Sequence, residues 1–454
     1  MRGWKIAGLK LREYLRFVFE WLPLGMGVKR WLLALIAGVA ILSLGFSFLL
    51  RELYPLPSIF YYLTLQFVPR TARGGLFVLI GAIAVGLGLV GLNRSLLKPF
   101  VDTSPEELLK TVRRYRRRER GPRVVAIGGG HGLSTLLRGV KEHTSNITAI
   151  VTVADDGGSS GRLRRELGVL PPGDFRNCIA ALADDEALTT HLFQYRFGSG
   201  SGLNGHSFGN LFITAMAEVT GSFEHAILES GRVLAVQGRV VPSTLHNVAL
   251  TADLVHVKQA ETSAQAHTSA ETELSRVSGE SRIPQAEGAI QRVYLDPSDA
   301  PAYPGAVHAL LNADLIVAGP GSLYTSVLPN LLVSAIADAV EASPACKVYV
   351  CNVATQFGET EGYSLGDHVA ALEKHVNRCL FPIVLANDNL SPTSTLAGGA
   401  GSQPEVEMVK PEVPVDIDYR VVTADLVDKS QPWRHDSRKL ARELMHQLHQ
   451  RALS

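Results

Sequence analysis

From residue 123 onward, short apolar runs alternate with segments in which apolar residues recur at helical spacing. Val124–Ile127, Ile147–Ala154 and Leu315–Ala318 are apolar or β-branched runs, and a glycine-containing loop follows each one. Such runs are typical of strands that are buried on both faces of a parallel sheet. Their alternation with helical segments predicts an α/β fold with a doubly wound, mostly parallel sheet.

Two longer apolar runs precede this alternating region. Residues 31–50 are twenty positions without a charge, and residues 74–92 are nineteen more. Each run is about long enough to cross a hydrocarbon core of roughly 30 Å as a helix. The pattern therefore predicts a membrane hairpin over residues 1–100, with two transmembrane helices at about 31–50 and 74–92.

Lysine and arginine counts predict the orientation of this hairpin. Residues 1–30 carry seven, the connecting residues 51–73 carry three, and residues 94–123 carry ten. Because cytoplasmic flanks collect basic residues, both ends are expected in the cytoplasm, as in a two-pass protein of the cell membrane. The basic juxtamembrane linker at 101–122 is then expected to touch anionic membrane lipid.

The composition limits the classes of molecule that the protein is expected to bind. A formal net charge of +1 over 454 residues gives no overall field that would attract nucleic acid. The four cysteines are scattered and lack the spacing of a zinc site, so they are expected to be reduced thiols. Residues 123–454 are therefore expected to form a cytoplasmic domain without nucleic acid among its partners.

A glycine cluster follows the first predicted strand. Glycines occupy positions 128–130 and 132, and Ser134 or Thr135 is expected to start the next helix. Backbone N–H groups in such a turn, beside a helix N-terminus, favour a bound anion such as phosphate. Leu133 replaces the last glycine of a G-x-G-x-x-G motif, and no Walker lysine follows, so an ordinary tight turn is the alternative.

Acidic and hydroxyl residues follow the second predicted strand, in the loop 155–161 with the sequence DDGGSSG. Loops after neighbouring parallel strands meet at one edge of the sheet, where ligands bind, so the two loops together indicate a phosphate-bearing ligand. Downstream, Asp174 is expected to cap a helix that carries Arg176 and Asn177. Arg176 is a candidate phosphate contact, with an ion pair to Asp174 or Glu166 as the alternative.

A second glycine turn occurs late in the chain. The strand ending at Ala318 runs into Gly319-Pro320-Gly321-Ser322 and further hydroxyl residues, which predicts a second anion-binding turn. Asn352 and the polar loop 355–360 end another predicted strand and suit a base or a sugar. Arg434 directly precedes the terminal helix and is placed either to fold over a bound phosphate or to face solvent.

Two segments are expected to lack regular secondary structure. Residues 261–281 are polar and poor in aromatic side chains, so they are expected to form a flexible surface insertion. Residues 390–414 are rich in proline, glycine and serine and are expected to be loop.

These motifs carry a family resemblance over nearly the whole of 123–454. GGGHGLSTLLRG (128–139), TVADDGGSSGRLRRELGVLPPGDFRNC (152–178), GHSFGNL (205–211), ADLIVAGPGSLYTSVLPNLLV (313–333), TQFGET (355–360) and RHDS (434–437) occur in order. In these segments the chain resembles the gluconeogenesis factor family, the YvcK-like branch of the CofD-like superfamily. It departs from that family at Ala354 and Phe357, where methionine and proline are usual.

The resemblance implies a Rossmann-like fold that binds a UDP-sugar such as UDP-N-acetylglucosamine. It also implies a regulatory role in cell shape and cell-wall synthesis during growth on gluconeogenic carbon, with cell-wall synthesis proteins as candidate partners. Self-association into a homo-oligomer is left open. The other branch of the superfamily is enzymatic and transfers 2-phospholactate to a deazaflavin with magnesium.

In the UDP-sugar hypothesis the diphosphate lies between Gly129–His131 and Gly319–Ser322, and Arg434 closes over it. Asp155 and Asp156 would hold the ribose or Mg²⁺, and Asn210 would orient the sugar phosphate. No catalytic residue is assigned. The complete predicted ligand-binding set is Gly129, Gly130, His131, Asp155, Asp156, Ser159, Ser160, Asp174, Arg176, Asn177, Asn210, Gly319, Gly321, Ser322, Tyr324 and Arg434.

Two other functions stay open on the sequence. One is a transferase of phosphorus-containing groups, of the 2-phospho-L-lactate transferase type, in which Asp155 or Asp156 would ligate Mg²⁺. The other is a membrane scaffold for cell-wall enzymes that needs no ligand.

Overall fold

The computed structural model describes residues 118–453, apart from 185, 199–201, 258–271 and 392–406, together with scattered positions between 39 and 86. The chain divides into two compact units, Met1–Ser104 and Pro105–Ser454. Most of the first predicted span and of the basic linker lies outside the described residues, whereas the described positions of the second span (74–77, 79–81, 83 and 86) are helical. Within the described part, no single helix is long and apolar enough for a membrane span, while one bent pair, Leu323–Leu331 and Ser334–Ala342, meets the length and composition criteria. That pair is largely buried in the fold described below.

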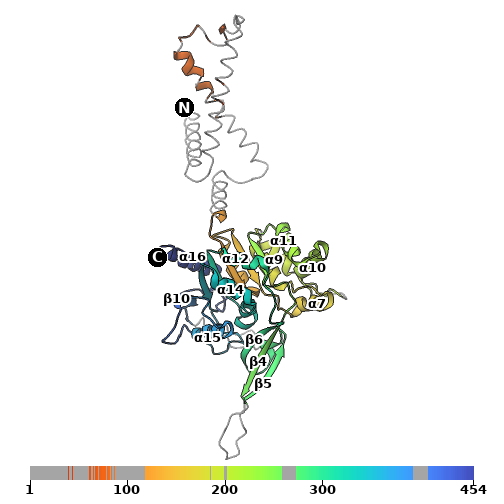
Figure 1. Ribbon diagram of the computed structural model, residues 1–454. Coiled ribbons are helices and arrows are strands. Elements are labelled where there is room, and N and C mark those ends of the chain that lie inside the picture. The colour runs from red at the N-terminus through yellow and green to blue at the C-terminus, as the bar shows by residue number, and fades with distance from the viewer. Residues whose placement is uncertain are drawn as a thin grey trace, which may run out of the picture. The chain divides into compact units, whose positions relative to one another are not determined.

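A seven-stranded parallel sheet forms the centre of the domain (Figure 1), as the apolar runs predict. Every neighbouring pair of strands in it is parallel. In spatial order the strands are β10 (Arg420–Ala424), β9 (Ile383–Asn387), β8 (Cys346–Val350), β7 (Leu315–Ala318), β1 (Val124–Gly128), β2 (Ile147–Val151) and β3 (Arg239–Pro242). The strand order reverses between β1 and β7. This reversal creates a topological switch point, where ligands bind in open α/β sheets.

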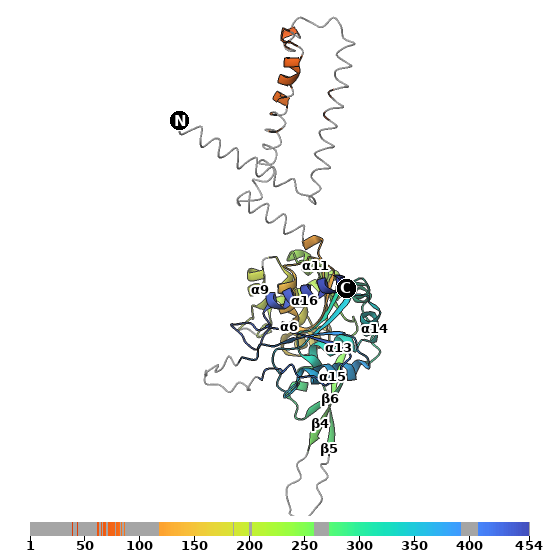
Figure 2. The same cartoon turned by 90° about the vertical axis from the view of Figure 1, so that its left-hand side faces the viewer.

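Two groups of helices cover the sheet. The first contains α6 (Gly130–Val140), α8 (Gly173–Leu182) and α16 (Ser437–Leu453), with α6 and α16 in direct contact (Figure 2). The second contains α12 (Pro304–Leu311), α13 (Leu328–Leu331) and α14 (Ser334–Ala342). Because crossovers between parallel strands are right-handed, reversing the strand order places the two groups on opposite faces.

The remaining helices fill the long connections. Between β2 and β3 lie α7 (Gly158–Leu167), α9 (Glu186–Gln194), α10 (Phe208–Thr220) and α11 (Phe223–Val233), and α15 (Leu365–Val376) lies between β8 and β9. A short 3₁₀ turn, Ile283–Gln285, and a π-helical turn, Leu323–Val327, complete the described elements.

A three-stranded antiparallel sheet corrects the prediction of a flexible insertion for residues 272–281, and the rest of the predicted segment, 261–271, lies outside the described residues. Its order is β5 (Thr272–Ser278), β4 (Ala249–Val257), β6 (Ala289–Asp296), and it extends away from the parallel sheet (Figure 1). The polar residues of β5 are compatible with an edge strand because cross-strand partners satisfy them, as when Arg276 donates to Asp253 at 2.8 Å. Composition alone cannot reveal such pairing.

The first helix begins earlier than predicted. α6 begins at Gly130 instead of at Ser134 or Thr135, and Gly129 caps it with an extended backbone. Gly130 adopts a positive φ of 58°, a conformation that favours glycine. The hydroxyls of Ser134 and Thr135 donate to the His131 carbonyl at 2.9 and 3.0 Å, inside the helix. The helix N-terminus therefore lies directly in the glycine turn.

Candidate functional site

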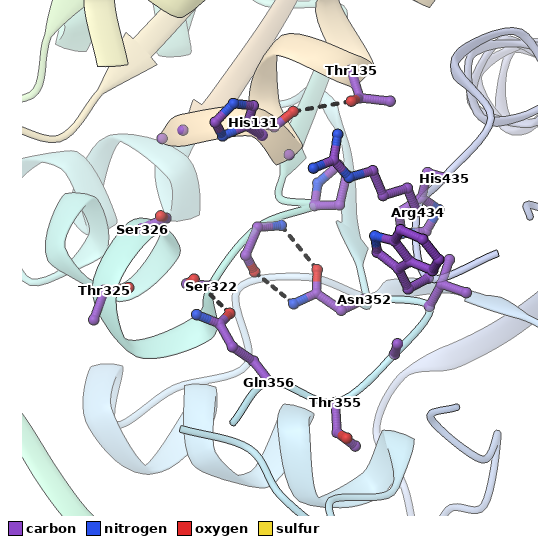
Figure 3. A pocket seen from close by; sticks show the side chains of 18 of the residues that line it. His131, Thr135, Ser322, Thr325, Ser326, Asn352, Thr355, Gln356, Arg434 and His435 are labelled. Atoms are coloured by element: carbon purple, nitrogen blue, oxygen red, sulfur yellow. Dashed lines mark hydrogen bonds between the residues drawn. The ribbon is translucent and has the colours of Figure 1, made fainter. Parts of the chain in front are cut away.

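A cavity of about 910 Å³ lies at the carboxyl edge of the parallel sheet. Its walls come from the turn after β1, the turn after β7, the loop after β8 and the segment that precedes α16 (Figure 3). This volume is in the range of small-molecule sites. The cavity therefore occupies the switch point of the fold, between β1 and β7.

The two glycine turns, almost 190 positions apart in sequence, both line this cavity. A Cβ on Gly132 would lie 2.3 Å from the carbonyl oxygen of Pro320, so the turns touch backbone to backbone. Only glycine at this position allows so close an approach. The predicted convergence of the two turns on one cleft is therefore present in the structure.

Asn352 holds the second turn in place. Its side-chain oxygen accepts from Gly321 N at 2.9 Å, and its amide nitrogen donates to Gly321 O at 2.9 Å (Figure 3). Gly321 has a φ of 150°, and both of its backbone polar groups are satisfied by this one side chain. The loop after β8 thus orients the turn after β7.

A hydroxyl and amide wall continues from this turn. Ser322 Oγ donates to Gln356 Oε1 at 2.6 Å (Figure 3), and Gln356 Nε2 donates to Glu359 at 2.9 Å. The buried Glu359 also accepts from Thr325 Oγ1 at 2.9 Å, and burial raises its pKa to about 7. This wall offers donors and acceptors that suit sugar hydroxyls.

Three carboxyl groups line another part of the cavity. They belong to Asp155, Asp174 and Glu280. Burial raises the pKa of Asp174 to about 7, and the neighbouring charge of Asp155 adds to this increase. Burial, together with the charges of Asp155 and Asp174, raises the pKa of Glu280 to about 8. The pKa of Asp155 is also raised, mainly by burial. These groups hold their protons more firmly than ordinary carboxyls.

Arg434 is the only lysine or arginine among the described residues that line the cavity. His131, at the first glycine turn, faces the same space, and burial and then the charge of Arg434 lower its pKa (Figure 3). His435 is anchored beneath them, where its Nε2 donates to Cys351 O at 3.2 Å and burial lowers its pKa to about 4. The cation of the site therefore comes from the C-terminal segment.

Several predicted site residues lie behind the cavity wall. Asp156 does not line the cavity, and its carboxylate accepts from Ser281 N at 2.8 Å, which ties the turn after β5 to the sheet edge. Ser159 is buried and shares a 3.0 Å hydrogen bond with His206. Ser160 is buried and accepts from Asn210 Nδ2 at 3.4 Å. These residues support the wall that Asp155 faces.

Arg176, Asn177 and Asn210 form part of the same buried layer. Arg176 donates to Ser207 at 2.7 Å and to Asn177 at 3.0 Å, and neither an ion pair with Asp174 nor one with Glu166 is among the described salt bridges. None of the three lines the cavity. They can act on a ligand in the cavity only through the residues in front of them.

The remaining predicted residues either line the cavity or are buried in the protein core. Gly129, Gly130, His131, Asp155, Asp174, Gly321, Ser322 and Arg434 line the cavity. Gly319 shapes the second turn with a φ of 79° but is not exposed to the cavity. Tyr324 is buried, and its hydroxyl shares a 2.9 Å hydrogen bond with that of Tyr363, so it is a core residue.

Sequence reasoning missed Glu280 and Trp433 as cavity residues. Glu280 lies in the polar segment that composition assigned to an insertion, and no local motif marks it. Trp433 directly precedes Arg434, and that position was the sequence signal that could have identified it. α16 begins at Ser437, so both residues lie in the segment before the helix.

Comparisons with known proteins agree with this architecture. Residues 124–450 match the family described as 2-phospho-L-lactate transferase CofD. The chain is 45% identical over 442 residues to a Nostoc sp. protein named "Putative gluconeogenesis factor", covering 94% of this chain and 92% of that relative. It is 44% identical over 327 residues to the gluconeogenesis factor of Bacillus subtilis, covering 70% of this chain and 96% of the relative.

A solved structure gives the same result for the fold. The crystal structure of a UPF0052 family protein from Bacillus halodurans matches with a TM-score of 0.60 and 39% sequence identity. The match covers 72% of this chain and 99% of that protein.

Proposed function

This chain belongs to the CofD family and is a homologue of the gluconeogenesis factors, and on that premise we propose that it is a ligand-binding regulator for a UDP-sugar. The expected ligand is UDP-N-acetylglucosamine. It would bind in the cavity between β1 and β7, at the carboxyl edge of the sheet.

The convergence of the two glycine turns on one cavity supports this proposal most directly. Gly129–Gly132 and Pro320–Ser322 expose backbone next to each other, and the first turn is also the N-terminus of α6. Backbone N–H groups and a helix N-terminus stabilise phosphate oxygens. Arg434 supplies the one guanidinium on the described lining, which suits a diphosphate.

Calorimetric titration of the full chain with UDP-N-acetylglucosamine tests the proposal. We expect saturable binding, and we expect UDP to compete for the same site. ATP serves as the control nucleotide with a different base. The absence of both heat and thermal stabilisation with every nucleotide and nucleotide sugar tried would reject a nucleotide-sugar function.

The cluster of Asp155, Asp174 and Glu280 in the cavity favours a second candidate, a magnesium-dependent transferase of the 2-phospho-L-lactate type. No group of three or more histidine, cysteine or acidic side chains in the described part of the chain could hold a metal unaided. Asp155 and Asp174 nevertheless fit a Mg²⁺ ion that is shared with ligand phosphates, because magnesium commonly uses one or two carboxylates plus phosphate oxygens. When bound, the ion would neutralise phosphate charge.

Product analysis separates this candidate from a regulator. A transferase should convert a phosphate-containing donor and an acceptor in the presence of Mg²⁺, and Asp174→Asn should abolish product. A regulator should bind its ligand and return it unchanged after long incubation.

The cellular role proposed here is the support of cell shape and wall synthesis on gluconeogenic carbon, from a position at the cell membrane. Complementation of a deletion strain by Arg434→Ala is the discriminating test. Failure to complement, with normal protein levels, supports a role that needs the ligand. Full complementation would instead favour a scaffold that needs no ligand.

A further inference from the structure

Two large aromatic residues of the cavity lining are only partly covered by protein. Among the described residues that line it, Trp433 and Phe357 are the only tryptophan, phenylalanine or tyrosine side chains. Their exposed fractions are 36% for Trp433 and 62% for Phe357. Exposed aromatic surface inside a concave polar site is a surface on which a planar group of a ligand can stack.

The backbone beneath Trp433 is held firmly. Arg434 N donates to Gln431 O at 2.8 Å, and Asp428 N donates to Arg434 O at 2.9 Å. The next residue, His435, is buried and donates to the carboxyl end of β8 at Cys351. Trp433 is therefore attached to a fixed rim, although its ring remains partly exposed.

The loop that carries Phe357 is also held at both sides of the ring. Gln356 N donates to Thr360 Oγ1 at 3.0 Å. On the other side, a Cβ on Gly358 would lie only 2.0 Å from Pro284 O, so this glycine packs directly on the turn that follows Glu280. Phe357 thus projects from a loop whose backbone is held on both sides.

The other lining residues suit the other parts of a nucleotide sugar. Glycine backbone and Arg434 suit the diphosphate, while the hydroxyl, amide and carboxyl groups suit sugar hydroxyls. A nucleobase is planar and gains from stacking on an aromatic face. In the described lining, Trp433 and Phe357 carry the largest aromatic faces, and the imidazole of His131 lies at the glycine turn assigned to the diphosphate.

We infer that Trp433 and Phe357 form the nucleobase subsite of this cavity, with Trp433 as the main stacking surface. This inference rests on the proposed nucleotide-sugar function and adds to it a position for the base.

Titration calorimetry of the full chain with two probes tests the inference. UDP carries both base and diphosphate, whereas inorganic pyrophosphate carries no base. Trp433→Ala should raise the Kd for UDP about 5- to 100-fold and leave the Kd for pyrophosphate within about twofold. Phe357→Ala should act in the same direction with a smaller factor, and Trp433→Phe should retain most of the affinity because it keeps a ring.

Tyr195→Ala is the matched control, because Tyr195 is 56% exposed and does not line the cavity. It should change neither Kd. Tryptophan fluorescence supplies a second readout: UDP should quench wild-type emission, and the quenching should disappear in Trp433→Phe, although Trp4, Trp21 and Trp31 remain.

The outcomes distinguish this inference from the proposed function. In one outcome, the wild-type chain binds both probes while the alanine variants raise the two Kd values equally, or raise neither. That result overturns the base subsite and leaves the diphosphate site standing. If the wild-type chain binds neither UDP nor pyrophosphate, the proposed function is overturned together with this inference.

Discussion

At the scale of single residues, Arg434 has a distinct position. It is far from both glycine turns in sequence, yet it lines the same cavity and acts electrostatically on His131. A guanidinium can bind two phosphate oxygens at once and cannot lose its charge at physiological pH. Arg434 is therefore the side chain on which anion affinity should depend most.

Arg434→Ala is expected to raise the Kd for UDP-N-acetylglucosamine about 10- to 100-fold, as the loss of a charged hydrogen-bond donor implies. Arg434→Lys should recover only part of the affinity, since lysine cannot form the bidentate contact. Arg438→Ala is the matched control, because Arg438 is exposed and pairs with Glu142 at 3.1 Å on the surface. Calorimetry measures all three, and an unchanged Kd in Arg434→Ala would remove this residue from the site.

The raised pKa values of Asp174 and Glu280 predict that anion binding depends on pH. Their pKa values of about 7 and about 8 mean that both groups are mostly neutral at pH 6 and mostly charged at pH 9. The two phosphates of a UDP-sugar have no proton to lose over this range. Rising pH therefore adds negative charge to the protein while the charge of the diphosphate stays constant, and the Kd should increase at least about 10-fold from pH 6 to pH 9.

Titrations in EDTA at several pH values measure this dependence. Asp174→Asn and Glu280→Gln should each flatten the curve, because each removes one titrating group. Binding that tightens as the pH rises would contradict the expected repulsion between these two carboxylates and the diphosphate.

At the scale of elements, the fit between the two glycine turns determines the shape of the site. α6 and the turn after β7 approach so closely that a methyl group at position 132 would overlap Pro320 O. Asn352 then fixes Gly321 from the loop after β8, and the contact of Gly132 with Pro320 joins the elements on the two sides of the switch point. Another close approach joins α6 to α16, where a Cβ on Gly139 would lie 1.9 Å from Ser437 O.

Gly132→Ala is expected to lower the free energy of unfolding by about 1–3 kcal/mol, as for overpacking of a tight contact. It should also weaken ligand binding, because the turns must separate. Gly198→Ala is the control, since a Cβ at Gly198 meets no atom within 4 Å. Urea denaturation measures the stability of both variants. Equal midpoints would show that the two turns can separate without lowering the free energy of unfolding.

At the scale of the whole molecule, the domain carries its own core and its own site. Buried apolar residues extend from Val124 to Met445, and every described residue that lines the cavity lies in this unit. The match to the Bacillus subtilis relative covers nearly all of that protein with 70% of this chain. The domain should therefore need no contribution from the first hundred residues to bind its ligand.

A fragment comprising residues 118–454 is expected to fold and to bind UDP-N-acetylglucosamine with the Kd of the full chain. Calorimetry and circular dichroism compare the two proteins. In parallel, the full chain should sediment with membranes and the fragment should not, as the apolar runs at 31–50 and 74–92 predict. A fragment that folds but loses its affinity would place part of the site in the N-terminal unit.

The sequence alone was sufficient for features that arise from local physics. Strands such as β1 and β7 follow from uninterrupted apolar runs, and the turns after them follow from glycine, because only glycine permits these backbone conformations and approaches. The parallel sheet and the two turns at its edge were therefore predictable. The polar strand β5 was not, because its stability comes from pairing with β4 and not from its own composition.

Tertiary structure alone decided which polar residues face the cavity. Asp155 and Asp156 look equivalent in sequence, yet Asp155 lines the cavity and Asp156 supports the turn after β5. Glu280 and Trp433 join the site only because the antiparallel sheet and the C-terminal segment fold back to its rim. The direction of a side chain depends on how separate elements pack against one another, and no local pattern records that packing.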